Sequence, residues 1–138
     1  MKPTAALAAL ETALKDANTG APNQVDIFVG EAGARMDSDG KAHAYIVLYP
    51  YTALADRAEE DLQASSSLRL QRFQATCAGG DVRRALIAVE RLQDTVVGKV
   101  LAPGTGVVRE DGDLGPLRKD LTVSPNRWYA PIDLVVET

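Results

Sequence analysis

Residues 68–97 read LRLQRFQATCAGGDVRRALIAVERLQDTVV, and this stretch decides the fold. Leu68–Ala78 alternates between apolar and polar residues, which predicts a strand with one buried face. Its apolar side carries Phe73, Ala75 and Cys77. Gly79-Gly80 then turns the chain. The same few residues therefore predict a strand that leads straight into a helix.

The helix is predicted over Val82–Val97, with Asp81 as its N-cap and Gly98 just past its end. Its apolar stripe is Val82, Ala85, Leu86, Val89, Leu92 and Val96. We expect Leu86, Val89 and Leu92 to pack on the sheet, so that Leu86→Asp would bury an unpaired charge at a high cost in stability.

The rest of the chain adds one helix and further strands. The expected elements are helix Thr4–Ala17 and strands Gln24–Gly30, Ala42–Tyr49, Leu117–Val123 and Trp128–Val136. Ala42–Tyr49 is apolar on both faces and is predicted to be central, whereas Pro131 predicts an edge strand or a bulge. The stretch Ala102–Pro116 has room for a short strand at Val107–Val108. Because strands follow strands, we predict the α+β class: a mostly antiparallel sheet of four to five strands with two helices packed on one face.

Composition bounds the kinds of function. The chain has 138 residues and a net charge of −4, which fits one domain over 1–138 with no general attraction for nucleic acid or anionic membrane. No apolar run approaches the roughly 20 residues that span a bilayer. The start lacks the pattern of a signal peptide, so we expect the protein to stay in the cytoplasm where it is made.

The sequence offers little for catalysis or metal binding. Cys77 is the only Cys and His43 the only His, so they cannot form a zinc cluster alone. A Cys77–His43 dyad is conceivable chemistry, but a buried structural Cys is the favoured interpretation. Asp37-Ser38-Asp39-Gly40 lacks the ligands of a calcium loop and predicts a hairpin turn. We therefore predict no enzyme activity and no cofactor.

Two stretches resemble tail terminator proteins of long-tailed, siphovirus-type bacteriophages. Leu70–Gly80 (LQRFQATCAGG), running into the Arg-rich helix, is similar to a family pattern in which a strand of the type Phe-Gln-Val-Thr-Cys/Ser-Val-Gly precedes a helix of about this length. Ala75 stands where Val is usual. Trp128–Val136 (WYAPIDLVV) is similar to the closing strand of that family, where Pro131 is less usual.

The resemblance implies a virion protein without catalytic residues. It would form a ring, a hexamer in that family, on the last ring of the tail tube, end tube polymerisation and offer the head's connector protein a surface, with DNA passing through the lumen. The protein would then be assembled in the host cytoplasm and reside at the head-proximal end of the tail.

Contacts with such partners are expected from long loops. The candidate loops are Gly33–Lys41, Tyr51–Ser67 and Ala102–Pro116. Arg83 and Arg84 are further candidates, because two cations in the first turn of a helix oppose its dipole. The full set of candidate contact residues is Arg35, Asp37, Asp39, Glu59, Glu60, Arg83, Arg84 and Arg109. The alternatives left open are a head–tail joining or tail-completion protein, a small Cys-dependent enzyme and a dimeric binding module.

Overall fold

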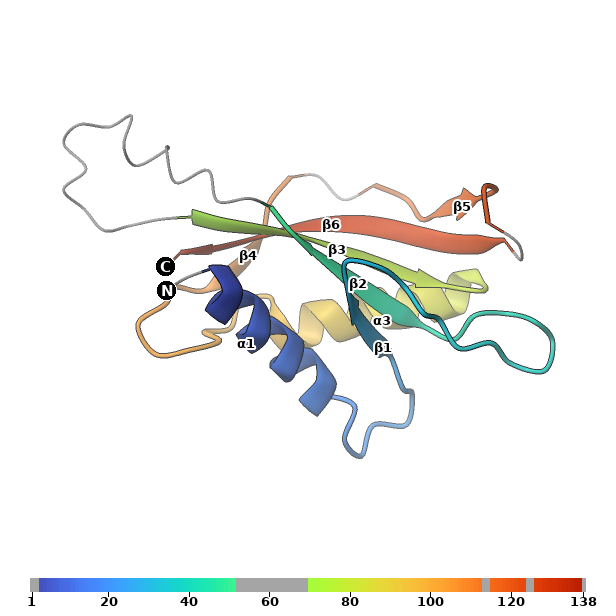
Figure 1. Cartoon of the computed structure of the whole chain (residues 1–138), viewed down its shortest axis with the longest axis horizontal. Helices are drawn as coiled ribbons and strands as arrows, with labels where there is room; N and C mark the ends of the chain where they lie inside the picture. The colour runs from blue at the N-terminus through green and yellow to red at the C-terminus, as the bar shows by residue number, and fades with distance from the viewer. Residues whose placement is uncertain (1–2, 52–69, 113–114, 124–125, 138) are drawn as a thin grey trace.

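The computed structural model describes residues 3–51, 70–112, 115–123 and 126–137. Within them, a sheet forms one layer and both helices form the other (Figure 1). The helices are α1 (Pro3–Asp16) and α3 (Val82–Val96). The strands are β1 (Asp26–Val29), β2 (Tyr45–Pro50), β3 (Leu70–Gly79), β4 (Val108–Glu110), β5 (Arg118–Asp120) and β6 (Arg127–Glu137). This confirms the predicted α+β class, with one more short strand than expected.

The strand order is β1-β2-β3-β6-β4, and β5 pairs with the other end of β6. The longest ladder joins β3 to β6 in antiparallel register, from Leu70 opposite Glu137 to Gly79 opposite Trp128. β2 lies between β1 and β3, which confirms the central position predicted for it. The two longest strands therefore form the middle of the sheet.

β1 and β2 are the one parallel pair in the described sheet, with Asp26 opposite Tyr45. Parallel neighbours need a connection that carries the chain back to the end where the first strand began. Residues 30–44 make that return without a helix. Part of the length of the loop Gly33–Lys41 is thus required by the topology.

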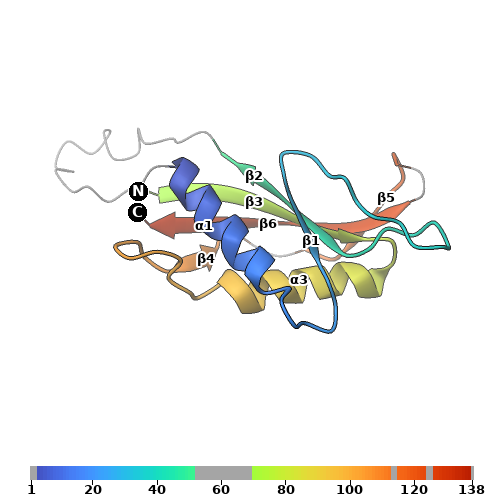
Figure 2. The same cartoon turned by 60° about the horizontal axis from the view of Figure 1, so that its bottom comes forward.

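The main core lies between the helices and the sheet (Figure 2). α1 contributes Leu10 and Leu14, which are fully buried and four residues apart, as an amphipathic helix requires. Phe73, Ala75 and Cys77 face the same core from β3, as the alternation of the sequence predicts. Burial of this single shared face holds the two layers together.

The structure corrects the predicted face of α3 in part. Leu92 is buried and Val89 packs against the core, as predicted, but Leu86 is not buried. The residues that α3 buries are Ala85, Ala88, Leu92 and Val96. By contrast, Val82 and Leu86 are 42% and 45% exposed. Both sets recur at helical spacing, so periodicity does not choose between them. Two alanines on the inner face let the helix lie closer to the sheet than two larger side chains would.

Pro131 is the second correction, because it lies neither on an edge strand nor in a bulge. It pairs with Thr76 inside the regular β3–β6 ladder. On the other side of β6, β5 pairs with residues 127–129 and β4 with residues 134–136. Pro131 falls in the gap between these short strands, where no partner strand needs the N–H that proline lacks.

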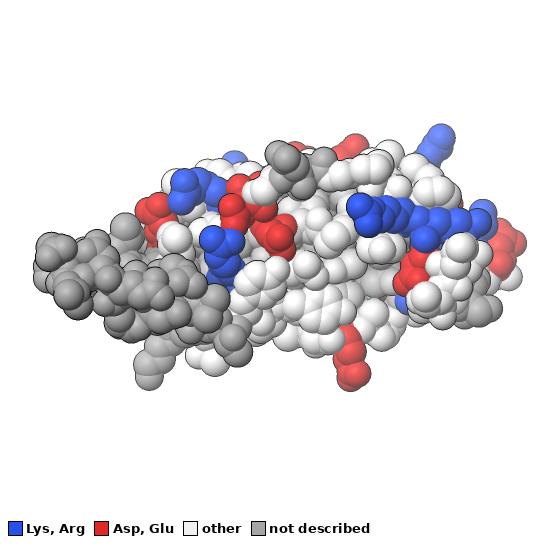
Figure 3. Space-filling model, turned by 90° about the horizontal axis from the view of Figure 1, so that it is seen from above, with Lys and Arg blue, Asp and Glu red and all other residues white. Residues whose placement is uncertain are grey.

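The face of the sheet opposite the helices, here called the open face, carries no helix in the described structure (Figures 1 and 3). Figure 3 looks onto this face, with charged side chains toward both ends and no cluster of basic side chains in the middle. A second, smaller apolar cluster lies on this side, with Tyr45, Val47 and Ala78 buried in it. Arg127 covers one end of that cluster, with its guanidinium carbon 5.5 Å from the centre of the Tyr45 ring.

Candidate interaction surfaces

Asp37 organises the predicted turn. One oxygen, Oδ1, accepts hydrogen bonds from the backbone N–H of Asp39 at 2.9 Å and of Lys41 at 3.0 Å. The N–H of Gly40 donates to the Asp37 carbonyl at 3.0 Å, and Gly40 has φ +78°. Asp and Gly are the residues that such a turn favours. The hairpin turn predicted for residues 37–40 is therefore confirmed.

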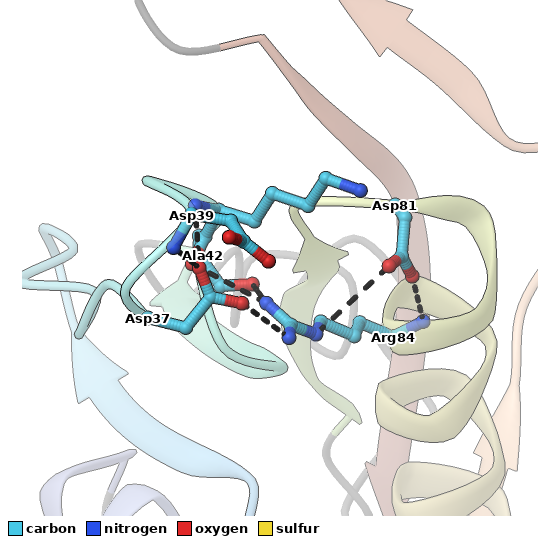
Figure 4. Close-up of polar contacts among 6 residues, drawn as sticks. Asp37, Asp39, Ala42, Asp81 and Arg84 are labelled. Atoms are coloured by element: carbon cyan, nitrogen blue, oxygen red, sulfur yellow. Dashed lines mark hydrogen bonds and ion pairs between the residues drawn. The ribbon is translucent and has the colours of Figure 1, made fainter.

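Arg84 ties this loop to the helix layer (Figure 4). Its Nη2 lies 2.5 Å from Oδ2 of Asp37, and its Nη1 donates to the Ala42 carbonyl at 3.0 Å. Asp37 and Arg84 are both largely shielded, with side chains 19% and 27% exposed. The N–H of Lys41 and, next, the guanidinium of Arg84 lower the pKa of Asp37 to about 2. We call these contacts the Asp37–Arg84 clamp.

The start of α3 fits closely against the same loop. Asp81 caps the helix, because its Oδ1 accepts from the N–H of Arg84 at 2.8 Å. A Cβ on Gly79 would lie 2.5 Å from Cβ of Arg84, and one on Gly80 would lie 2.7 Å from the backbone N of Ala42. Glycine is required at both positions because backbones approach one another there. The Gly79-Gly80 turn is thus also a packing contact.

The other candidate contact residues are dispersed. Arg35 Nε pairs with Asp26 at 2.8 Å, and the exposed Arg109 of β4 pairs with Glu137 at 2.9 Å. Asp39 and Arg83 are exposed and form no ion pair within the described part of the chain. The remaining two candidates, Glu59 and Glu60, lie outside the described residues, as does the predicted loop Tyr51–Ser67 beyond Tyr51.

Three of the predicted arginines meet at one polar cleft of about 450 Å³. Arg35 comes from the β1–β2 loop, and Arg83 and Arg84 come from the first turn of α3. Its full lining is Pro22, Asn23, Gln24, Arg35, His43, Ala44, Asp81, Arg83, Arg84 and Ile87. Since Arg35 and Arg84 are already paired with carboxylates, the cleft holds little net positive charge for an anion.

A larger apolar groove, of about 670 Å³, lies between the first half of α3 and the β5–β6 side of the sheet. The groove exists because the two helices do not cover the whole sheet. In addition, the part of β6 between its pairings with β4 and β5 has no strand beside it on that edge. Its lining is Val82, Leu86, Val89, Gly115, Pro116, Leu117, Arg118, Trp128, Ala130, Pro131 and Ile132. Apolar grooves of this size are common binding sites.

Sequence reasoning missed the groove, although a signal was present. The apolar stripe of α3 has six members and is too wide for one contact with one sheet. Val82, Leu86 and Val89 form a second face of the helix, and all three line the groove. A stripe that is wider than its core contact predicts a second apolar surface.

None of the described residues that line either hollow is a Ser, Thr or Cys, and the polar cleft carries one imidazole and one carboxylate, from His43 and Asp81. Cys77 is fully buried in the main core, and this burial raises the pKa of its thiol far above the ordinary value, which keeps it protonated and unreactive. His43 lines the polar cleft instead. No group of three His, Cys, Asp or Glu side chains in the described part of the chain could hold a metal ion.

Neither described helix is both long and apolar enough to cross a membrane. The chain matches no protein-family model. A comparison with curated proteins found no similar sequence.

Proposed function

We propose that this chain is a tail terminator of a long-tailed bacteriophage. In this proposal it is a structural virion protein that forms a ring on the end of the tail tube, ends tube polymerisation and provides the surface to which the head attaches. The observation that carries the proposal is the position of the two resembling stretches. They form β3 with α3, and β6, and β3 pairs with β6 along its whole length. The similar segments thus make one contiguous unit.

A closed ring requires two different complementary surfaces on each subunit. The two ends of the sheet differ in the elements that they carry. One end carries the clamped loop Gly33–Lys41, the start of α3 and β5, and the other carries both chain ends and the turn after α3 (Figures 1 and 2). This difference supports head-to-tail contact between subunits, whereas a two-fold dimer would use the same surface twice.

A tail terminator must also let DNA pass. The middle of the open face has no cluster of basic side chains (Figure 3), and the whole chain carries a net charge of −4. A strongly basic lumen would hold the phosphates of DNA by counterion release. A ring with the open face toward its axis would avoid that, which is a second feature in favour of the proposal.

The test is genetic. A phage whose genome encodes this chain is produced with the gene disrupted, and particles are examined by negative-stain electron microscopy. We expect tails of uncontrolled length that do not join heads, with rescue by the gene supplied in trans. Normal tails on normal particles would contradict the proposal.

The same images separate the main alternative. Tails of normal length that fail to attach would identify a head–tail joining or tail-completion protein. The Cys-dependent enzyme finds little support in the described residues, because the Cys77 thiol is buried with a raised pKa. Retention of function by Cys77→Ala would remove that alternative.

A further inference from the structure

The apolar groove leaves large side chains in contact with water. Val82 and Leu86 lie one helical turn apart on α3, and they are 42% and 45% exposed. Trp128, the only tryptophan of the chain, lines the same groove. A contiguous apolar surface of this kind is typical of an interaction site. We therefore expect another segment to cover this surface.

The lining of the groove carries one charged side chain, and it is basic. Arg118 is part of this lining, whereas Arg83, the neighbour of Val82 in the chain, lines the polar cleft. Arg118 is exposed and forms no ion pair with another described residue. A good occupant would combine apolar side chains for the floor of the groove with a carboxylate for Arg118.

One segment of this chain has that composition. Residues 52–69 read TALADRAEEDLQASSSLR, with Leu54, Ala58 and Leu62 spaced four residues apart. The segment has four acidic residues and two basic ones, a net charge of −2, which is half of the net charge of −4 of the whole chain. Its charge is therefore opposite in sign to that of Arg118.

The residues that flank this segment favour a second copy as its source. Tyr51 and Leu70 lie at one end of the β2–β3 ladder, while Val82 and Trp128 lie beyond its other end. The nine steps from Leu70 to Gly79 span about 30 Å. Tyr51 donates to the carbonyl of Arg72, and Leu54 lies only three residues after Tyr51, a reach of about 11 Å. Leu54 therefore falls short of the Trp128 of its own copy, which pairs with Gly79.

We propose that residues 52–69 of one copy bind in the apolar groove of the next copy, with Leu54 and Leu62 against Leu86 and Trp128 and an acidic residue beside Arg118. This inference rests on the ring proposed above and supplies its subunit contact. Because the groove and the segment are different parts of the chain, the contact is head-to-tail and can be repeated around a ring.

Trp128 gives a direct measurement, because it is the only tryptophan. A synthetic peptide of residues 52–69 is titrated into the full-length protein, diluted until it is monomeric by native mass spectrometry. We expect a saturable change in tryptophan emission, at least about tenfold weaker binding to the Leu86→Asp variant and no change with a peptide carrying Leu54→Asp and Leu62→Asp. An unchanged emission up to about 1 mM peptide, or equal binding to Leu86→Asp, would overturn the proposal.

Mixing two variants tests the contact in the intact chain. Leu86→Asp lacks a groove and Leu62→Asp lacks a segment, so each alone should be monomeric in native mass spectrometry. Their mixture should give a single one-to-one complex, because one good groove then meets one good segment. Oligomers of Leu86→Asp alone would contradict the contact. A change of Trp128 emission in the Leu62→Asp monomer, relative to the wild-type monomer, would also contradict it, because the segment would then fill the groove of its own copy.

These results are separable from the function. Self-association through the groove in a protein whose loss leaves tails normal would refute the tail terminator and keep the contact. Tails of uncontrolled length without the protein, combined with wild-type association by Leu86→Asp, would keep the terminator and refute the contact.

Discussion

Arg84 shows what the sequence can and cannot tell about a single side chain. Its position in the first turn of α3 follows from the helix pattern, and the unfavourable dipole there predicted a contact with a partner. The structure instead shows a contact within the molecule, with Asp37, which is 47 positions away in the chain. No local pattern connects residues so distant, because their meeting depends on the parallel return of the chain to β2.

The Asp37–Arg84 clamp predicts a pH-dependent stability. The pKa of Asp37 is about 2 in the folded chain against an ordinary 3.8, so its ionised form stabilises the fold above pH 3.8, and this contribution is lost as the pH falls toward 2. Asp37→Asn keeps the oxygen that accepts from Asp39 and Lys41 but removes the charge. We expect it to lower the unfolding free energy at pH 7, measured with urea, and the difference from wild type to shrink below pH 3.8.

Asp39→Asn is the matched control for this prediction. Asp39 is exposed and forms no ion pair with the described residues, so its substitution should leave the pH dependence unchanged. A difference between wild type and Asp37→Asn that is the same at pH 7 and near pH 2 would show that the clamp does not act through the carboxylate charge.

Gly80 gives a prediction about close packing. An added Cβ would lie 2.7 Å from the backbone N of Ala42 and 3.0 Å from its carbonyl oxygen, and neither atom belongs to a flexible side chain. Gly80→Ala should therefore lower the unfolding free energy by about 1–3 kcal/mol in urea titrations. Gly115→Ala is the control, since a Cβ there meets no atom within 4 Å. Equal effects of the two substitutions would mean that the approach of Gly80 to Ala42 is unimportant.

At the level of elements, the sequence predicted what local rules control. Alternation identified β3, and Asp81 and Gly98 marked the bounds of α3, where the structure finds a capping bond and a φ of +80°. The parallel pairing of β1 and the interior position of Pro131 escaped prediction. Both depend on which strands lie beside them, and proline in β6 is tolerated because its neighbours β4 and β5 are short.

The face of α3 can be tested with one substitution made at two sites. Leu92 is fully buried and Leu86 is 45% exposed, so Leu92→Ala should cost about 2–5 kcal/mol of unfolding free energy. Leu86→Ala should cost about 1 kcal/mol or less, because less apolar surface returns to water. Urea unfolding of both variants decides the matter. If Leu86→Ala is the more costly change, α3 packs on the face that periodicity first suggested.

At the level of the whole molecule, the exposed surfaces were harder to predict from the sequence than the core. Sequence patterns find residues that are buried, since burial imposes a period. They do not show which apolar residues remain exposed after folding, because that depends on how far two helices extend over a sheet. The groove beside α3 is a property of the assembled layers. Its recognition therefore required the structure, although Val82, Leu86 and Trp128 were visible in the sequence.

The last prediction joins this surface to particle assembly. Leu86→Asp places a charge in the groove at a position that is 45% exposed, so the protein should remain folded, with cooperative urea unfolding. A subunit that folds but cannot contact its neighbour cannot close a ring. In a phage lacking its own copy of the gene, Leu86→Asp supplied in trans should leave tails of uncontrolled length. Ala8→Asp, which adds the same charge on an exposed site of α1, should restore normal particles. Rescue by Leu86→Asp equal to that of Ala8→Asp, measured as the fraction of tails with heads in negative stain, would show that the groove has no part in assembly.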